Sequence, residues 1–417
     1  MPYSNFSSPR FLGIALCLLV TLVYGGLAIL FSNREPAGDE LRYLEYAVNL
    51  TKGYYVTDAQ PHFINTPGYP MLLMPFANGG LKALFIARLL NVLLMAVATS
   101  LFFHLACRYL SPLLAAGITL ISVFHPTLAG EVPLLMSEAL SFALLAAFLS
   151  AYTRSLNAAD AKRWRWVLLA AFAFGALVMT RVIFGYVAMA LLGFSVFGFL
   201  IHRAWRQAWL STAVICAGTL ILCIPYLSYT QAKTGKTLCW TTTGAEMFYW
   251  MTSSLPGENG YWFSHDTVLE RPELAAHRGL YVEVCQSKSP ANEERLMERV
   301  REQFKANPMG FVHNWLCNWP RMFFGFPRSF EHENLTRVFL VAWNGPLILA
   351  LIAACLLGWR RWLAAPPEIG LLLLFAAIFT GGSSMAPALP RYLVIMIPVL
   401  WLCALAMLAR HVKLRVE

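Results

Sequence analysis

Charged side chains are scarce in this sequence. Only 13% of its 417 residues are charged, whereas 58% are hydrophobic, and the mean hydropathy is +0.57. A water-soluble chain of this length needs far more polar surface to cover its core. The composition therefore excludes a soluble globular protein and points to an integral membrane protein.

Several other signals are missing as well. The sequence has no internal repeat, no low-complexity tract and no linker that would set apart a soluble domain. Its histidines do not have the spacing of metal ligands. We therefore predict no metal site and no certain cofactor, and leave open a divalent ion held by acids.

The nine cysteines give no metal-binding pattern either. Most lie in or beside apolar runs, as small core residues do. Only Cys239, Cys285 and Cys317 fall in a long polar segment, where an oxidising compartment would permit one disulfide and leave an odd thiol.

Long apolar runs are what the sequence has in abundance. A bilayer core about 30 Å thick requires about 20 mostly apolar residues per helix. The longest runs are Phe11–Phe31, Ala83–Cys107, Glu131–Tyr152, Ile183–Ile201, Trp209–Tyr229, Val338–Gly358 and Leu393–Arg410. Three shorter runs are Pro112–Phe124, Val167–Thr180 and Ile369–Thr380. Together they predict an all-α polytopic membrane protein with about ten transmembrane helices.

Basic residues gather in alternate short loops, which predicts the orientation. With a cytoplasmic N-terminus, the inner loops hold Arg10, Arg108, Arg154, Lys162, Arg163, Arg165, Arg203, Arg206, Arg360, Arg361, Arg410, Lys413 and Arg415. Such an excess marks the cytoplasmic side. We predict a multi-pass protein of the inner (plasma) membrane, with both termini cytoplasmic and the active site facing the periplasm or exterior. The net charge of +10 is explained by contact with membrane lipids, so no nucleic-acid partner is predicted.

Two outer segments are too long to be simple turns. They divide the chain into an N-terminal transmembrane catalytic region 1–228, which includes a first outer loop 32–80, an outer subdomain 229–337 and a C-terminal transmembrane region 338–417. In the subdomain, Lys236–Trp250 favours short strands and Asn292–Lys305 favours a helix. We therefore expect a small mixed α/β subdomain that covers the active site or acts as a structural cap.

The first outer loop begins with an amphipathic pattern. Leu41, Leu44 and Val48 share one helical stripe, which predicts an interfacial helix on the membrane surface. Asp39 lies near its N-cap and Glu40 in its first turn. Helix capping and the helix dipole would explain both acids without any catalytic role.

Further charges recur at the outer ends of the predicted spans. Arg88, Glu138, Arg181 and Arg391 all fall at this level, where an isolated charge usually faces a bundle interior or a cavity. We therefore expect the outer ends of the helices to surround a site of acids and arginines.

These segments, in this order, resemble a known family over most of the chain. They are Gly38-Asp39-Glu40, Pro67-Gly68-Tyr69-Pro70, Ala87-Arg88-Leu89-Leu90, Ser137-Glu138-Ala139, Thr180-Arg181 and Arg391-Tyr392. They resemble the integral-membrane glycosyltransferases of the GT-C fold, which include protein O-mannosyltransferases and the aminoarabinose transferases that modify lipid A. The segments Thr234–Lys236, Thr241–Gly244 and Asn292–Pro308 are similar to the outer segment of bacterial members.

The resemblance implies a reaction. Such enzymes move a sugar, with inversion, from a polyprenyl phosphate carrier to a lipid, glycan or protein acceptor on the outer face, in lipopolysaccharide or protein glycosylation of the cell envelope. Asp39 matches the family's general base, and Glu40 would orient the acceptor or Asp39 itself.

The remaining candidates would bind the substrates. Arginine suits a phosphate because its planar fork donates two hydrogen bonds. Arg88, Arg181 and Arg391 are the first phosphate candidates and Arg42 and Lys52 the next; Glu138 would hold the sugar, and Tyr55, Tyr69 and Tyr392 complete the predicted substrate-binding set. The ordinary roles of these residues at a membrane interface are snorkelling, ion pairing and aromatic anchoring.

Two other functions fit a polytopic membrane protein. A flippase or transporter of lipid-linked oligosaccharides would place charges near the bilayer midplane and often shows inverted repeats. Here the charges cluster toward one face and no repeat is present. An O-antigen polymerase would carry its two large loops later in the chain, whereas one long loop here follows the first span.

Overall fold

The structure, a computed structural model, describes residues 8–57, 61–158, 160–287, 290–330, 335–358 and 366–411. Within these ranges the chain is helical and forms no β-strand. The predicted class, an all-α polytopic membrane protein, is confirmed.

Eight helices in the described ranges are long and apolar enough to cross a membrane. They are α1 (Pro9–Leu30), α4 (Gly80–Ala106), α7 (Glu138–Asn157), α9 (Ile183–Ile201), α10 (Arg206–Thr234, preceded by η2, Arg203–Trp205), α16 (Leu335–Gly358), α17 (Pro367–Ser384), and the run formed by α18 (Pro390–Leu393), η5 (Val394–Met396) and α19 (Ile397–His411). Of the three shorter predicted spans, two form α5 (Pro112–Val123) and α8 (Asp160–Val178), and the third forms α17, which is one of the eight.

The helices at the centre of the bundle are buried, and the outer helices expose apolar side chains. The C-terminal run α18 to α19 is 78% buried over its most apolar window and α7 is 72% buried, whereas α1 is only 28% buried and exposes Ile14, Leu18 and Leu22. At the centre Phe148 of α7 stacks on Phe174 of α8, with ring centroids 4.5 Å apart. The exposed apolar faces of the outer helices need lipid as their solvent.

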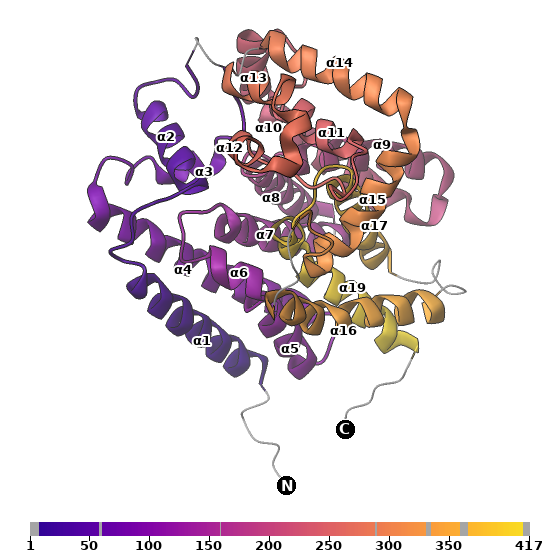
Figure 1. The fold of residues 1–417 in the computed structure, drawn as a ribbon. Coiled ribbons are helices and arrows are strands. Elements are labelled where there is room, and N and C mark those ends of the chain that lie inside the picture. Colours follow the sequence, from indigo (N-terminus) through magenta and orange to yellow (C-terminus); the bar gives the residue numbers. More distant parts are fainter. Residues whose placement is uncertain are drawn as a thin grey trace.

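The remaining helices are shorter, and several of them gather at one end of the bundle (Figure 1). They are α2 (Asp39–Thr51), α3 (Gly68–Leu73), α6 (Pro126–Glu131), α11 (Gly244–Thr252), α12 (His265–Glu270), η3 (Pro272–His277), α13 (Leu280–Ser287), α14 (Pro290–Ala306) and α15 (Pro308–Phe324). Figure 1 shows α2 and α11 to α14 at this end, while α1 begins and α19 ends toward the other. We call the end that carries these short helices the loop face.

The short strands that we predicted in Lys236–Trp250 do not form. Gly244–Thr252 is helix α11 instead, and the preceding residues bond to the first long loop, where the backbone N–H of Thr242 donates to the carbonyl of Phe63 at 2.9 Å. The aromatic and threonine content that favours strands is used here for packing, since Trp240 and Trp250 are fully buried. The expectation of a mixed α/β subdomain was therefore wrong for the described residues.

One predicted span is divided by a turn. We expected a single run from Glu131 to Tyr152, but α6 ends at Glu131 and α7 begins only at Glu138. Pro133 lies between them, and proline cannot continue the hydrogen-bond ladder of a helix. The division places Glu131 at the end of α6 instead of inside a span.

Candidate active site

The helix predicted at the start of the first long loop is α2, and its first turn carries both acids. Gly38 precedes it with φ 57° and ψ −123°, a backbone conformation that suits glycine. Successive helical residues project about 100° apart. Asp39 and Glu40 therefore face different neighbours although they are adjacent in the sequence.

Asp39 lies between two arginines. Its Oδ1 accepts a hydrogen bond from Arg42 at 2.8 Å, and its Oδ2 accepts one from Arg391 at 2.9 Å. Burial opposes ionisation of Asp39, but the charges and hydrogen bonds of Arg42 and Arg391 outweigh it and hold the pKa of the carboxyl below its usual range. Asp39 is therefore a charged group with one arginine on each oxygen, and each oxygen keeps a further lone pair.

Arg42 also connects α2 to the segment that returns to the bundle. Its Nε donates to Oδ1 of Asn65 at 2.8 Å, and the amide nitrogen of Asn65 donates to the Tyr43 hydroxyl at 3.2 Å. Sequence analysis did not single out Asn65. Its spacing from Asp39 carried no signal of this contact.

A second acid–arginine pair lies deeper. Arg181, in the turn between α8 and α9, forms an ion pair with Oε1 of Glu138 and donates from Nε to Ser141 at 3.2 Å. Glu138 is only 2% exposed, and its other oxygen, Oε2, is buried without a hydrogen-bond partner in the described part of the chain. A buried carboxylate oxygen without a donor is costly and uncommon in folded proteins.

Glu131 is a residue of this site that sequence analysis missed. It is half-buried at the end of α6. Burial raises the pKa of its carboxyl to about 7, the negative charges of Glu138 and Asp39 add to the shift, and Arg391 and Arg181 oppose it. Helix α6 packs against α18, the short helix that carries Arg391. Pro133 was the signal that could have separated it from the following span.

These residues form one group, which we call the acid–arginine cluster: Asp39, Arg42, Glu131, Glu138, Arg181 and Arg391. Sequence analysis named five of them as candidate site residues, and Glu131 was found only in the structure. Guanidinium groups bind phosphate oxygens in pairs, and a carboxylate can take a proton from a hydroxyl. Tyr392, another predicted residue, borders the cluster, because the guanidinium of Arg391 lies over its ring with 5.6 Å to the centroid.

Glu40 does not face the cluster. It is 1% exposed, and its Oε1 accepts from the backbone N–H of Leu135 at 2.9 Å. Its Oε2 accepts from Arg34 and from the N–H of Ala37 at 3.1 Å. With both oxygens occupied it is not placed to orient an acceptor, but it does fix the start of α2, and hence Asp39, against the turn after α6.

Two predicted phosphate ligands also lie apart. Arg88 is fully buried on α4 and donates to the carbonyls of Arg34 at 2.9 Å and Ser32 at 3.5 Å, so it holds the chain that leaves α1. Lys52 is the exposed C-cap of α2, about 20 Å along the helix from Asp39 at 1.5 Å per residue. Neither residue contributes a charge to the cluster.

The two tyrosines predicted to stack on the sugar are buried. Tyr55 is 4% exposed and its hydroxyl donates to the carbonyl of Asn65 at 2.8 Å. Tyr69 is fully buried, with its ring edge-on to Tyr43 and its hydroxyl next to Asn91. Both rings support the loop that carries Asn65, and neither face is open to a ligand.

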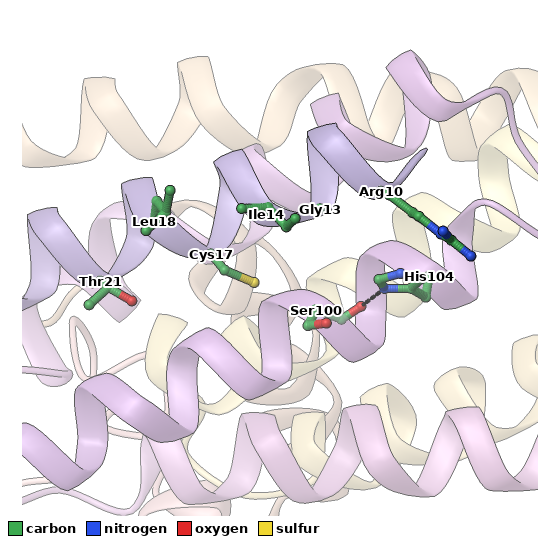
Figure 2. Close-up of a pocket in the computed structure, with 8 residues that line it drawn as sticks. All are labelled: Arg10, Gly13, Ile14, Cys17, Leu18, Thr21, Ser100 and His104. Atoms are coloured by element: carbon green, nitrogen blue, oxygen red, sulfur yellow. Dashed lines mark hydrogen bonds between the residues drawn. The ribbon is translucent and has the colours of Figure 1, made fainter. Parts of the chain in front are cut away.

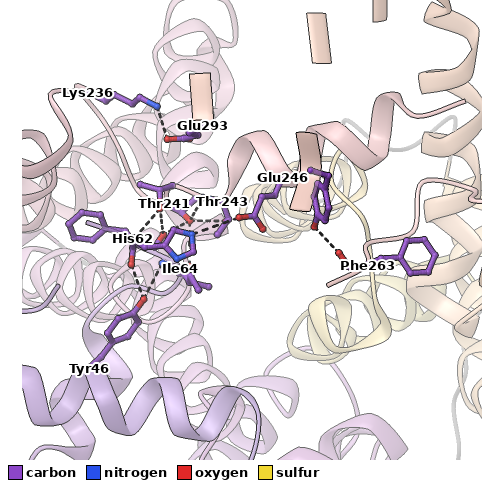
Figure 3. Close-up of polar contacts among 12 residues, drawn as sticks. Tyr46, His62, Ile64, Lys236, Thr241, Thr243, Glu246, Phe263 and Glu293 are labelled. Atoms are coloured by element: carbon purple, nitrogen blue, oxygen red, sulfur yellow. Dashed lines mark hydrogen bonds and ion pairs between the residues drawn. The ribbon is translucent and has the colours of Figure 1, made fainter. Parts of the chain in front are cut away.

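Polar contacts join this first long loop to the second. Thr241 donates to the carbonyl of Phe63 at 2.7 Å; the neighbouring carbonyl of His62 accepts a hydrogen bond from Tyr46 within the first loop at 3.0 Å. The His62 ring lies 3.8 Å from the carboxylate of Glu246 (Figure 3). The helices from α11 onward are therefore tied to the loop that bears the cluster.

A groove of about 380 Å³ lies elsewhere, between α1 and α4. Figure 2 shows Arg10 and His104 at one end of it and Thr21 toward the other. None of its lining residues is acidic. The groove is thus chemically unlike the acid–arginine cluster and shares no residue with it.

Metal binding has no support from side-chain geometry in the described ranges. No group of three or more histidine, cysteine, aspartate or glutamate residues there is arranged to hold a metal ion. The described cysteines, including Cys239, Cys285 and Cys317, form no disulfide bond.

Comparison with solved structures identifies the fold of this chain. No protein-family model matches the sequence, and no curated protein matches it. Solved structures do share its architecture, and they show that the chain has the GT-C fold of membrane glycosyltransferases, as the sequence resemblance predicted.

The similar structures include an archaeal oligosaccharyltransferase, AglB from Archaeoglobus fulgidus. In complex with an inhibitory peptide and a dolichol-phosphate it gives a TM-score of 0.54 at 14% identity, over 98% of this chain and 51% of that chain. Its apo form gives a TM-score of 0.55 at 13% identity with the same coverage. ArnT from Cupriavidus metallidurans bound to undecaprenyl phosphate gives a TM-score of 0.45 at 15% identity, over 96% of this chain and 77% of that chain. The chain thus spans about half the length of the oligosaccharyltransferase.

Proposed function

We propose that this protein is an inverting glycosyltransferase that takes a sugar from a polyprenyl phosphate carrier of the undecaprenyl phosphate type. The observation that carries the proposal is the acid–arginine cluster at the loop face of a GT-C fold. It combines cations for a phosphate leaving group with carboxylates for proton transfer. The acceptor is a lipid, a glycan or a protein.

The arginines are the proposed phosphate ligands. Arg42 and Arg391 each give one hydrogen bond to Asp39, so each retains further N–H donors. Arg391 is 31% exposed and Arg42 27% exposed, whereas Arg181 is 12% exposed and paired with Glu138. Arg42 and Arg391 are therefore the accessible pair for the phosphate, and Arg181 lies behind them. Tyr392 keeps its proposed place beside the substrates, next to Arg391.

The orientation of the site is part of the proposal. The loop face would be the non-cytoplasmic side, because the opposite end carries the basic loops that sequence analysis placed in the cytoplasm. The protein would act in the inner (plasma) membrane with its site open to the periplasm or exterior. The described residues 229–287 and 290–330, tied to the first loop through Thr241, would cover the site and influence the choice of acceptor.

The test is sugar transfer by the purified protein in lipid with a panel of polyprenyl phosphate sugars. The parent should transfer a sugar from at least one carrier, and Asp39→Asn should lose most of that turnover. The matched control is Glu45→Gln, which changes an exposed acid on the same helix and should leave turnover unchanged. Failure of the parent with every carrier would favour the transporter, which was the alternative from sequence.

A further inference from the structure

The groove between α1 and α4 has no part in the proposed sugar transfer. Its volume of about 380 Å³ lies within the range of small-molecule sites, which is about 300–1,000 Å³. Its surface is mostly apolar, and two of the side chains that line it, Ile14 and Leu18, are exposed. Both helices are long and apolar enough to cross a membrane, so lipid is the molecule that reaches this groove.

The groove has the length of one leaflet of a bilayer. Its lining residues on α1 run from Arg10 to Thr21, which is about 16 Å along the axis at 1.5 Å per residue. The hydrocarbon core of a bilayer is about 30 Å thick, so one leaflet contributes about half of that. Arg10 lies in the first turn of α1 and Thr21 near its middle. The groove therefore extends from one membrane surface toward the midplane.

The charge in the lining is positive and lies at one end. Figure 2 shows Arg10 and His104 together there, and no acid lines the groove. Arg10 is exposed and makes no hydrogen bond or ion pair with a residue that the structure describes. Nδ1 of His104 donates to the carbonyl of Ser100 at 2.7 Å, because a carbonyl can only accept, and this bond fixes the ring. The Arg10 guanidinium thus keeps its N–H donors for an anion.

Gly13 explains why α4 comes so close to α1 at the charged end. A Cβ at this position would lie 3.3 Å from the ring of Phe103 and 3.4 Å from Cε1 of His104. Gly13 follows Arg10 by one helical turn, so the two residues share one face of α1. The missing side chain at Gly13 therefore brings the His104 ring to the face of α1 that carries Arg10.

We propose that this groove binds one anionic phospholipid, with its phosphate at Arg10 and one acyl chain along the groove toward Thr21. A phosphate is complementary to a cation without neighbouring acids, and an acyl chain is complementary to an apolar groove that is one leaflet long. In the proposed orientation the lipid comes from the cytoplasmic leaflet, whose anionic lipids attract basic residues. The inference needs only the membrane class of the protein and not the sugar transfer.

The polyprenyl carrier is a poorer match for this position. Its phosphate is proposed to lie at the loop face, beside Arg42 and Arg391. The charged end of the groove is at the start of α1, toward the other end of the bundle (Figure 1). A carrier with its phosphate at Arg10 would therefore hold its reacting end far from the cluster.

Native mass spectrometry of the purified full-length protein tests the proposal, with phosphatidylglycerol as the anionic probe and phosphatidylcholine as the zwitterionic one. The parent should bind the first phosphatidylglycerol roughly 5-fold more tightly than phosphatidylcholine, the factor expected for one basic residue near anionic lipid. Arg10→Ala should remove most of this preference. Arg165→Ala, which removes an exposed arginine of α8 outside the groove, should keep it.

A second pair of variants tests the position of the acyl chain without a change of charge. Leu18→Trp should fill the groove and lower the occupancy of the first phosphatidylglycerol several-fold. Leu18 is 58% exposed, so the fold should tolerate the larger side chain, and thermal unfolding without added lipid should match the parent. Leu22→Trp is the matched control, because Leu22 is 72% exposed on the same helix but does not line the groove.

Three results would overturn the proposal. Equal affinity for the two lipids, with no effect of Arg10→Ala, would mean that the groove holds ordinary boundary lipid only. Displacement of bound phosphatidylglycerol by an equimolar polyprenyl phosphate would assign the groove to the carrier. A dimer of the parent that Leu18→Trp dissociates would assign it to a second copy of the chain. Sugar transfer is measured separately, so each of these results leaves the proposed function standing.

Discussion

The Arg391 guanidinium donates to the Asp39 carboxylate at 2.9 Å although 352 residues separate them. The contact joins the first long loop to the start of the last transmembrane run. Asp39 lies in the first turn of α2 and Arg391 in α18, so two segments from opposite parts of the chain define the cluster. Several predictions about variants depend on this contact.

Arg391→Ala should weaken carrier binding by roughly 10- to 100-fold, because hydrogen bonds to charged groups contribute about 1.5–3 kcal/mol. Arg391→Lys should lose less, since it keeps the positive charge but not the planar fork. Binding of a polyprenyl phosphate to purified protein measures both. Arg295→Ala, which removes an exposed arginine of α14, is the control. Unchanged binding in both Arg391 variants would remove this residue from the phosphate site.

Asp39 should make stability depend on pH in a defined direction. Its folded-state pKa lies below the unfolded value of about 3.9. The stabilisation is therefore complete above the unfolded pKa and is lost as the pH falls through the folded pKa. Asp39→Asn should unfold more easily than the parent near pH 6, by on the order of 1 kcal/mol, and the gap should close under strongly acidic conditions. Thermal unfolding in detergent across this range would contradict the ion pairs if the gap widened toward low pH.

Glu40→Gln should destabilise the fold by about 1–3 kcal/mol, since an amide cannot accept all of the hydrogen bonds from Arg34, Ala37 and Leu135. The exposed neighbour Glu45 supplies the comparison, because Glu45→Gln should change unfolding by less than about 0.5 kcal/mol. Equal unfolding temperatures for the two variants would mean that Glu40 does not anchor α2.

Gly68→Ala should impair transfer without touching a substrate. A Cβ at Gly68 would lie 2.5 Å from the carbonyl oxygen of Met179 and 2.7 Å from Oγ1 of Thr180, which directly precede Arg181. The turn that carries Arg181 must then shift, at a cost of about 1–3 kcal/mol. Gly244→Ala is the matched control, because a Cβ there meets no atom within 4 Å. Transfer assays that rank the two variants alike would contradict this close packing.

Labelling with a membrane-impermeant maleimide should place α2 and the start of α8 on opposite sides of the membrane. Glu45→Cys should react from outside intact cells, and Lys162→Cys should react only after the membrane is opened. Both native residues are exposed, and the parent labelled in parallel gives the background from its own cysteines. Reaction of both positions only after opening would reverse the proposed orientation.

The apolar runs were sufficient to predict the membrane class, because a helix in lipid needs a length and composition that are visible residue by residue. Glu138, Arg181 and Arg391 were also visible, as isolated charges that recur at the outer ends of the apolar runs, and Asp39 was visible as an acid at the start of an amphipathic helix. The direction of a side chain was not visible. Arg88 lies at the same end of the bundle as Arg391 but bonds to backbone carbonyls, and Tyr55 and Tyr69 are packed inside the loop that they were expected to line.

Glu131 and the residues around α11 show a second limit. An apolar run that contains Pro133 was taken as one span because its mean hydropathy outweighed one proline, so the titratable residue before it was assigned to lipid. The threonines and aromatics before α11 favour strands in general, but a strand needs a neighbour, and here the backbone of Phe63 takes the available hydrogen bonds. The first error arises from averaging hydropathy over a local proline, and the second from a contact between distant segments.

The contact between Thr241 and Phe63 also affects how the protein is made. The loop around Phe63 emerges early in synthesis, but the threonines that bond to it follow only after α10. The last arginine of the cluster, Arg391, is later still. During translation, several hydrogen-bonding groups of the early loop must therefore bond to water until most of the chain has been inserted. A ribosome that stalls before the final helix would leave in the membrane a nascent chain that is largely threaded and yet has no complete cluster.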